Sequence, residues 1–309
     1  MGAYVVNRLI QMFVVIVGIS VIVFVITNMI GDPVNVLLPP ETPYEQREIF
    51  REQMGFNRPL VVQYLDFAVD AVRGDFGNSF RTARPATTIV LERMPATLLL
   101  TVSATLVATL IAIPMGIISA YKRHSIWDNL TTIFVVTGQA MPIFWLGLLL
   151  IIIFGVNLKW LPPSGYGDFG IERLKHLILP MAVLGFFLAP VTERLVRSGM
   201  LDALSQDYVR TARAKGLSER IVLFRHALRN TIIPVITVLG LQFGQLLGGA
   251  VITESVFAWP GVGLLAIDSI RNSDFPVTQA VVVILAVLIS FVNLSVDLIV
   301  GVLDPRIRR

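Results

Sequence analysis

Runs of apolar residues long enough to cross a lipid bilayer recur along this 309-residue chain, and they constrain its fold more than any other feature. A helix of about 20 apolar residues matches a hydrocarbon core roughly 30 Å thick. Because the runs are continuous rather than alternating, they favour helices over a β-barrel. We therefore expect an all-α, polytopic membrane protein with six transmembrane helices, at residues 9–30, 96–120, 130–156, 176–196, 231–256 and 279–303.

The composition agrees with a membrane location. Charged residues make up 15% of the chain, whereas soluble domains average roughly 25%. The first apolar run is longer than the core of a signal peptide and has no A-x-A site after it, so it is predicted to be a retained span. Because the sequence has no cysteine, it excludes disulfides, cysteine-ligated zinc and iron–sulfur clusters.

Positive charge is divided unevenly between the two sides of the predicted membrane protein. With a cytoplasmic N-terminus, the inner segments carry 14 Lys and Arg against seven acids, and the outer segments carry 11 against 14. Cytoplasmic loops of membrane proteins are enriched in Lys and Arg. The sequence therefore predicts that both termini are cytoplasmic.

The first outer segment, about residues 31–95, carries helix start and stop signals. "TPYE" at residues 42–45 reads as a capping box, and Gly55 can end the helix that it starts. A second helix is expected from Pro59 to Val72, stopped by Gly74. We expect a small helical outer segment rather than an independent domain.

Several short motifs suggest catalysis and fail on their context. "GYGD" at residues 165–168 lacks the second acid that paired-carboxylate chemistry needs, and "GVGLLA" at 261–266 lacks the strand and acid of a dinucleotide site. No lysine is followed by Ser or Thr, so no ATP-binding P-loop is present, and the three histidines lack metal-ligand spacing. We expect no catalytic site and no metal site on this chain.

The fifth span places Gly240, Gly244 and Gly248 four residues apart on one helix face. Such a face lets two helix backbones approach closely, so helix packing is the favoured interpretation. The alternative is that the neighbouring Gln242 and Gln245 face a translocation path, to which Gln139 and Asn293 in other spans are further candidates.

The densest positive charge lies at residues 208–230, "YVRTARAKGLSERIVLFRHALRN", with six Lys and Arg and one acid. The pattern predicts two short helices, the first capped by Asp207 and ended by Gly216 in the left-handed conformation, the second capped by Ser218. In the second, Ile221, Phe224 and Leu228 form an apolar stripe. The stripe needs a partner surface, or else the basic helices lie on anionic lipid.

"DYVRTARAKGLSERIVLFRHALRNTIIPVIT" closely resembles the cytoplasmic EAA-type loop of ABC-transporter permeases of the dipeptide/oligopeptide/nickel branch. The general pattern of this loop is E-A-A, three residues, Gly, nine residues and I-x-L-P, and only Ala212 and Gly216 match it. The longer strings R-T-A-R-A-K-G and H-A-L-R-N look like the peptide/nickel branch. Further strings resemble its landmarks in the right order: "GDP" at 31–33, "RPLVVQYLDF" at 58–67, "GDFGNSF" at 74–80, "FAWPGVG" at 257–263 and "LDPRIRR" at 303–309.

The resemblance implies a MetI-like permease subunit in a bacterial inner membrane. It implies a second, homologous permease subunit, two cytoplasmic ATPases that hold the ATP and Mg²⁺, and an outer solute-binding protein, with no nucleic acid among the partners. Residues 1–95 would form the first span and the outer segment, and 96–309 a five-helix core with a coupling loop at about 198–230. The loop would dock on an ATPase through Tyr208, Arg210, Ala212, Arg213, Lys215, Gly216, Ile221, Phe224 and Arg225.

The substrate is the open point of this interpretation. Di- or oligopeptides are the expected cargo; the alternatives are nickel complexes, glutathione or another small solute carried by the same class of transporter. A secondary transporter is a second alternative, but it needs coupling acids near the middle of the membrane, which the predicted spans lack.

Overall fold

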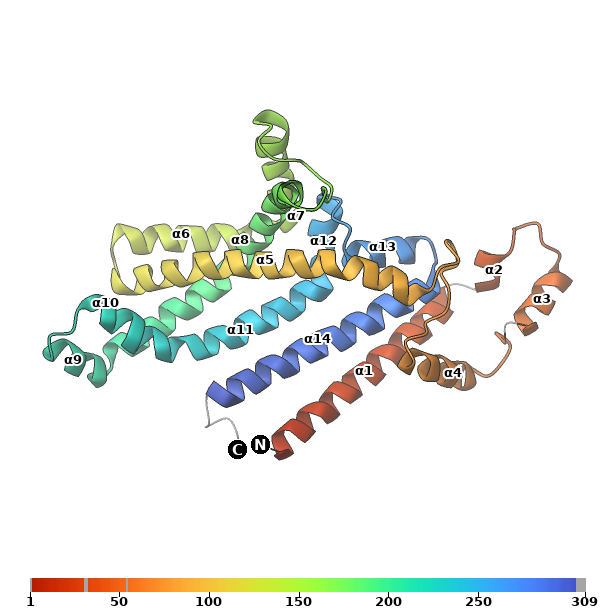
Figure 1. Ribbon diagram of the computed structural model, residues 1–309, viewed down its shortest axis with the longest axis horizontal. Helices are drawn as coiled ribbons and strands as arrows, with labels where there is room; N and C mark the ends of the chain where they lie inside the picture. Colours follow the sequence, from red (N-terminus) through yellow and green to blue (C-terminus); the bar gives the residue numbers. More distant parts are fainter. Residues whose placement is uncertain (1, 31–32, 54, 304–309) are drawn as a thin grey trace. The chain divides into compact units, whose positions relative to one another are not determined.

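The computed structural model describes residues 2–30, 33–53 and 55–303, and in these residues the chain is almost entirely helical (Figure 1). The only strand-like pairing in this part is a bridge between Asn78 and Pro85. The chain forms two compact units. Of the described residues, the first unit holds 2–5, 98–259 and 292–303, and the second unit holds 6–30, 33–53, 55–97 and 260–291.

Among the residues that the structure describes, five helical stretches are long and apolar enough to cross a membrane. They lie in α1 (Gly2–Ile30), α5 (Ala86–Tyr121), α8 (Ile171–Ser205), the stretch Glu219–Gly248 and α14 (Phe275–Leu303). Each contains most or all of one of the predicted spans, which confirms the all-helical, polytopic prediction. The fourth span is longer than predicted, because α8 continues through Pro180 and Pro190.

The third predicted span is wrong as a single straight helix. The chain forms α6 (Ile126–Ala140) and then α7 (Ile143–Leu150), which continues as a π-helix (Ile151–Asn157), and the two parts are bent by 105°. The break falls at Met141, which is extended, because the ring of Pro142 disfavours the helical conformation in the residue before it. The described part of the chain therefore holds six candidate spans only if this bent pair counts as one.

The fifth predicted span also ends too late. Helix α11 (Leu228–Gly249) stops after two consecutive glycines, and Val251–Val256 forms the separate helix α12. Glycine is a poor helix former, so a Gly-Gly pair is a weak point where tertiary packing can redirect the chain. Helix α13 (Val262–Arg271) follows in the second unit.

Helix α8 is the centre of the first unit, where it packs against α6, α7, α11 and α12. Two glycines allow close approach between helices: a Cβ on Gly185 would overlap Val107 of α5, and one on Gly199 would overlap Thr231 of α11. Small residues at crossings let membrane helices gain van der Waals contact, since lipid offers no hydrophobic drive for association.

The second unit contains the outer segment together with parts of three long helices, α1, α5 and α14. The segment forms α2 (Pro33–Leu37), α3 (Tyr44–Gln53) and α4 (Leu60–Val72). Gly55 and Gly74, which were predicted to end two helices, follow α3 and α4, and both are left-handed. The core of the unit includes Val90, Val262 and Ala280. The structure thus confirms a small helical segment after the first span.

Candidate functional site

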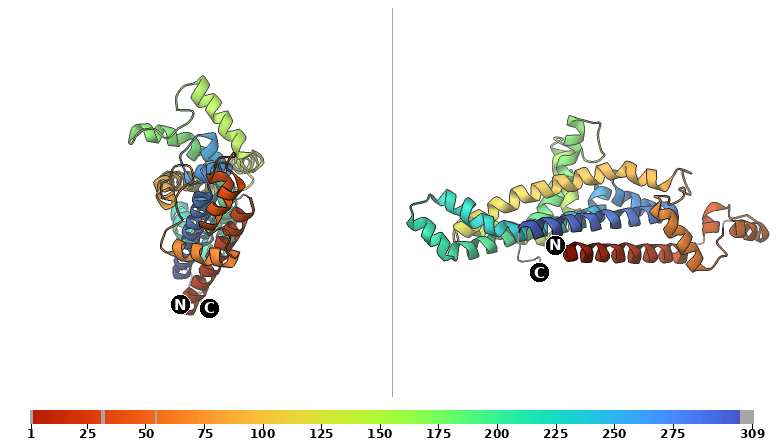
Figure 2. Two further views of the ribbon diagram at one scale, coloured as in Figure 1. Left: turned by 90° about the vertical axis from the view of Figure 1, so that its right-hand side faces the viewer. Right: turned by 60° about the horizontal axis from the view of Figure 1, so that its bottom comes forward.

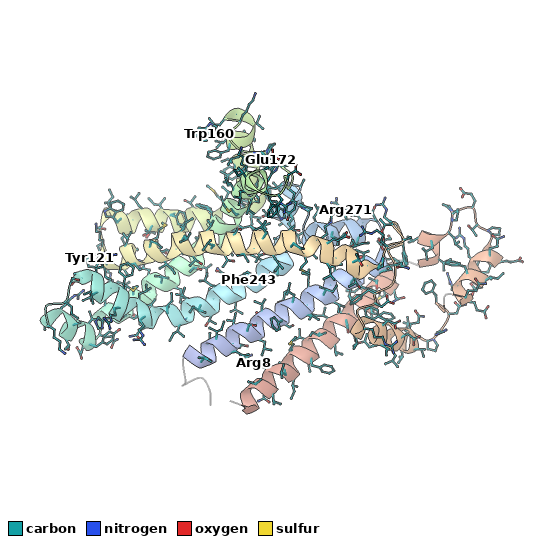
Figure 3. The ribbon with its side chains drawn as sticks, viewed as in Figure 1. Arg8, Tyr121, Trp160, Glu172, Phe243 and Arg271 are labelled. Atoms are coloured by element: carbon teal, nitrogen blue, oxygen red, sulfur yellow. The ribbon has the colours of Figure 1, made fainter. Side chains whose placement is uncertain are left out.

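The basic segment at residues 206–230 lies at one end of the first unit, beside the turn that joins α5 to α6 (Figures 1 and 2). Trp160 and Glu172 lie away from this end, whereas Tyr121 marks it (Figure 3). The segment consists of α9 (Asp207–Ala214), a turn, α10 (Glu219–Ile221) and a π-helix (Val222–Ala227) that leads into α11. The sequence predicted two short helices with a hinge, and this division is what the structure shows.

The turn centres on Gly216, which has a φ of +74°. A Cβ at this position would meet nothing within 4 Å, so the glycine is required by the backbone conformation and not by space. The predicted cap at Asp207 is wrong, because this residue begins the helix and Gln206 holds the cap position. Ser218 does precede α10, although its side chain makes no capping hydrogen bond.

An ion pair closes the turn from α9 to α10. Arg213 donates from Nε to Glu219 Oε1 at 2.8 Å and from Nη2 to Oε2 at 3.2 Å. This forked geometry is more specific than a single contact, and the hydrogen-bonded carboxylate of Glu219 raises the pKa of Arg213 above its ordinary value. Arg213 therefore orders the segment and is less available to a partner than the sequence implied.

The segment has a small core of its own, made by Leu204, Val209, Ala212 and Val222. Ala212 is almost fully buried in it. The expectation that Ala212 supplies apolar contact to a partner is therefore corrected, because its methyl group packs between α9 and the π-helix. Because of this core, the segment at residues 206–230 is a folded unit rather than an extended loop; it is called the knob below.

A mixed apolar and basic surface covers the knob. Tyr208, Ile221 and Phe224 are 40%, 41% and 54% exposed, and a hydrogen bond from Asn230 Nδ2 to the Tyr208 hydroxyl, 2.9 Å long, fastens Tyr208 to the start of α11. Arg210, Lys215 and Arg225, three of the basic residues predicted to dock, are exposed as well. These six residues are called the coupling face below. Leu228, the third residue of the predicted stripe, instead packs on the core of the first unit.

A buried polar cluster lies between α5, α6 and α8. Asp128 accepts hydrogen bonds from Ser119 Oγ at 2.6 Å, from the His124 backbone N–H at 3.0 Å and from Arg197 Nε at 3.0 Å. The cluster was missed from the sequence, since Arg197 lies 69 residues from Asp128 along the chain. The available signal was an acid at the start of a span and an arginine at the end of another, both on the predicted inner side.

Helix α8 also carries Glu193, which is 2% exposed. Its Oε1 is buried with no hydrogen-bond partner among the residues that the structure describes. A buried carboxyl group is costly in a membrane span, which makes it a functional candidate on general grounds. The sequence showed this residue only as an interruption of the fourth span.

The four residues predicted for a translocation path are not brought together by hydrogen bonds in the described part of the chain. Gln242 is buried and joins two helices, accepting from Thr192 Oγ1 at 3.0 Å and donating to the Leu188 carbonyl at 3.2 Å. Gln139 and Gln245 are exposed and Asn293 is partly buried. The structure thus gives Gln242 an interhelical role and leaves the other three as candidates.

The three glycines of the predicted packing face, Gly240, Gly244 and Gly248, differ in burial and in their neighbours. A Cβ on Gly240 would collide with the side chain of Val296 on α14. Gly244 is buried and Gly248 is exposed. Gly240 therefore lies at a close helix crossing within the first unit.

Comparison with known proteins identifies the relatives of this chain. Residues 112–309 match the family model described as binding-protein-dependent transport system inner membrane component, and residues 1–101 match the model of its N-terminal part. The oligopeptide transport system permease protein AppB of Bacillus subtilis (strain 168) is 42% identical, over 99% of each chain. The glutathione transport system permease protein GsiC of Escherichia coli (strain K12) is 40% identical, over 99% of this chain and 98% of its own.

Solved structures show the same fold at low sequence identity. The methionine ABC transporter MetNI, in inward-facing conformations, matches with a TM-score of 0.57 and 17% identity, over 70% of this chain and 96% of the solved chain. An amino acid ABC transporter solved with histidines matches with a TM-score of 0.52 and 16% identity, over 71% and 94%.

Proposed function

Because this chain belongs to the family of binding-protein-dependent transport system inner membrane components, we propose that its coupling face is the surface on which a cytoplasmic ATPase docks. The chain is a membrane-spanning permease subunit of an ABC importer, a class in which ATP is hydrolysed on partner subunits. In the proposed assembly it pairs with a second, homologous permease subunit. Two ATPases bind below the pair, and an outer solute-binding protein delivers the substrate.

One observation carries the docking proposal: exposed apolar side chains stand on a preformed basic knob. Tyr208, Ile221 and Phe224 remain exposed although Val209 and Val222 beside them are buried. Aromatic side chains in an apolar centre with a charged rim are typical of protein interfaces. The exposed basic residues of the coupling face can steer the approach of an acidic surface.

The connections of the knob suit it for transmitting movement. It follows α8 directly and leads through the π-helix into α11, and these two helices pack against each other. A rigid segment between two packed helices moves both when it is pushed. We propose that closure of the ATPase pair moves the knob as a lever and switches the spans between inward- and outward-open states.

The same reasoning supports the predicted orientation. The basic segment and the turn with Lys122 and Arg123 lie at one end of the first unit (Figure 1). Two positively charged connections at a common end fit the cytoplasmic side of a bacterial inner membrane. We propose that both termini are cytoplasmic, that residues 1–95 form the first span with an outer segment, and that 96–309 form the permease core.

We propose di- or oligopeptides as the substrate. The similar proteins AppB and GsiC are named as oligopeptide and glutathione transport permeases, and glutathione is itself a small peptide. Nickel complexes or another small solute remain the alternative within this transporter class. An exposed docking segment is expected in an ATP-driven permease, which must bind an ATPase. It is not expected in a secondary transporter, which has no ATPase partner.

The docking proposal is tested by Phe224→Asp in the complete transporter. A charge in the apolar centre of an interface should weaken the permease–ATPase complex at least tenfold, which corresponds to about 1.4 kcal/mol, and reduce peptide-stimulated ATP hydrolysis accordingly. Co-purification of the ATPases and the rate of phosphate release measure this.

The matched control is Phe169→Asp. Phe169 is a more exposed phenylalanine in the loop before α8, outside the coupling face. It should leave both measurements unchanged. Normal ATPase retention by the Phe224→Asp permease, or equal losses from both variants, would refute the docking surface.

A further inference from the structure

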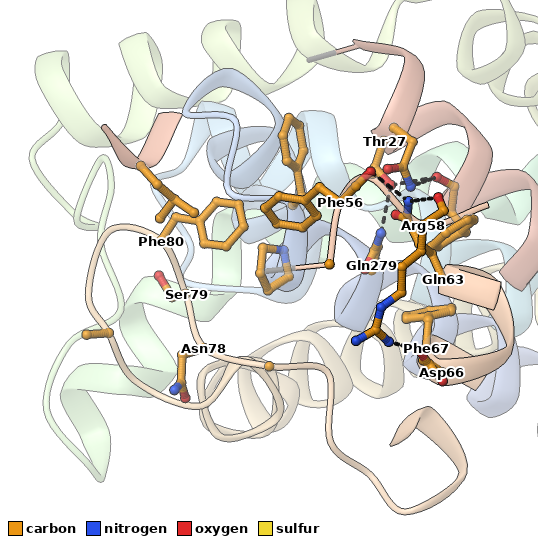
Figure 4. A pocket seen from close by; sticks show the side chains of 18 residues that line it. Thr27, Phe56, Arg58, Gln63, Asp66, Phe67, Asn78, Ser79, Phe80 and Gln279 are labelled. Atoms are coloured by element: carbon orange, nitrogen blue, oxygen red, sulfur yellow. Dashed lines mark hydrogen bonds and ion pairs between the residues drawn. The ribbon is translucent and has the colours of Figure 1, made fainter. Parts of the chain in front are cut away.

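A cavity of about 610 Å³ lies in the second unit, where the end of α1, the helix α4, the loop at residues 77–83 and the start of α14 meet (Figure 4). Pockets for small molecules in proteins commonly measure about 300–1,000 Å³ and combine apolar walls with a few polar groups. Five aromatic side chains line this one: Phe24, Phe56, Phe67, Phe80 and Phe275. The cavity therefore has the size and wall chemistry of a ligand site.

Four carboxamide side chains line the cavity, and three of them, all but Asn78, donate hydrogen bonds to neighbouring protein groups. Asn28 donates its Nδ2 to the Phe24 carbonyl at 2.9 Å, and Gln279 donates its Nε2 to Thr27 Oγ1 at 2.7 Å. Gln63 donates its Nε2 to two backbone carbonyls, at 3.0 and 2.8 Å. Gln63 thus donates twice to the protein and Asn28 and Gln279 once each, and the carbonyl oxygens of these amides can accept hydrogen bonds from a ligand.

Arg58 supplies the positive charge of the cavity, and Asp66 the negative charge. Arg58 Nη1 contacts Asp66 Oδ2 at 3.2 Å, and both side chains are about 60% exposed. An exposed pair held by a single contact contributes little, about 0–1 kcal/mol. The guanidinium lies against Gly55, where a Cβ would come within 3.1 Å of Arg58 Nε, so the glycine leaves room for this placement.

We propose that this cavity binds the carboxyl-terminal end of a short peptide. The peptide carboxylate takes the place of Asp66 on Arg58, because an arginine fork binds a free carboxylate through two N–H groups and here uses one. Main-chain N–H groups of the peptide donate to the carboxamide oxygens, and the last side chain packs among the phenylalanines. The inference rests on the proposed function, and it assigns to the outer segment a site where a peptide binds directly.

The choice of a peptide carboxyl end follows from complementarity. Acceptor oxygens on three amides match the repeated N–H donors of a peptide, which a metal complex does not offer. Arg58 and Asp66 are the charged side chains that line the cavity. Because Asp66 is about 60% exposed, its carboxylate can be solvated by water when the peptide carboxylate takes its place on Arg58.

The experiment uses the complete transporter in lipid nanodiscs, without the outer binding protein and without nucleotide. The probe is the tripeptide Ala-Ala-Phe, compared with its C-terminal amide and with its N-acetyl form. We expect the free acid and the N-acetyl form to bind roughly tenfold more tightly than the amide, since one charge-assisted contact is lost in the amide. In Arg58→Gln this preference should fall to near one.

The matched control is Arg84→Gln. Arg84 pairs with Glu92 outside this cavity; these two residues are also eight positions apart in the sequence, and they are similarly exposed. The Arg84→Gln change should preserve the preference for the free acid. Equal binding of acid and amide, a preference that survives Arg58→Gln, or no saturable binding because a partner protein fills the cavity would each overturn the proposal. Uptake of the same peptide into proteoliposomes with ATP and the outer binding protein tests the proposed function separately.

Discussion

At the scale of single residues, the left-handed backbone conformation of Gly216 is what the proposed coupling requires. Its φ of +74° is unfavourable for other residues, and a valine there should strain the turn by about 1–2 kcal/mol. Because a Cβ would have open space, the strain comes from the backbone alone. We predict that Gly216→Val uncouples ATP hydrolysis from transport, measured in reconstituted transporter as substrate moved per ATP hydrolysed.

Asparagine is the informative control at this position. It adopts the left-handed conformation more readily than other non-glycine residues, and its Cβ would meet no atom within 4 Å. Gly216→Asn should therefore keep most of the coupling. If Gly216→Val transports normally, or if Val and Asn are equally damaging, the left-handed turn is not what coupling requires.

At the scale of the elements, the Asp128 cluster joins three helices next to the coupling segment. Asp128 is buried and Arg197 is one third exposed, so the loss of one partner leaves a poorly solvated charge. We predict that Asp128→Asn lowers the stability of the purified permease by about 2–3 kcal/mol. Thermal unfolding in detergent measures the change.

A double-mutant cycle separates the pair from its surroundings. Adding Arg197→Gln to Asp128→Asn should cost much less than the sum of the two single changes, because both charges are then gone. The exposed pair of Arg210 and Asp207 is the comparison, and its removal should change stability by less than about 0.5 kcal/mol. Additive losses at Asp128 and Arg197 would contradict a direct ionic tie.

At the scale of the whole molecule, the prediction concerns which side of the membrane each segment faces. The chain has no cysteine, so a single introduced cysteine reports one position. Ser218 precedes α10 in the coupling segment, and Ser164 lies in the loop between the π-helix after α7 and α8; both are exposed. In intact spheroplasts, a membrane-impermeant maleimide should label Ser164→Cys and should label Ser218→Cys only after lysis. The reverse pattern would invert the proposed topology.

The apolar runs alone predicted the helical membrane class and placed five of the spans, because the thickness of a bilayer sets the length that a span must reach. They predicted the third span poorly, since hydropathy averages composition over a window of residues. Such an average does not change when the helix bends sharply. Pro142 was visible as a signal, but a proline inside a membrane helix is often tolerated. The bend depends on how the neighbouring helices pack.

The candidate site shows the same division. Gly216 and the basic coupling segment were readable, because a left-handed turn and a charge cluster are local properties of the chain. The burial of Ala212, the bond between Gln242 and Thr192, and the Asp128–Arg197 pair were not, since each depends on how separate helices pack against one another.

By itself, the sequence determined that this chain is a helical membrane protein of the ABC permease kind with a basic, hinged segment. Local chemistry suffices for that, because bilayer thickness, glycine conformation and family strings are written along the chain. Only the tertiary structure decided which of the predicted residues form the surface of that segment and which form its core. Burial is a property of packing between elements, and packing also created the carboxamide-lined cavity around Arg58, whose members come from four separate parts of the chain.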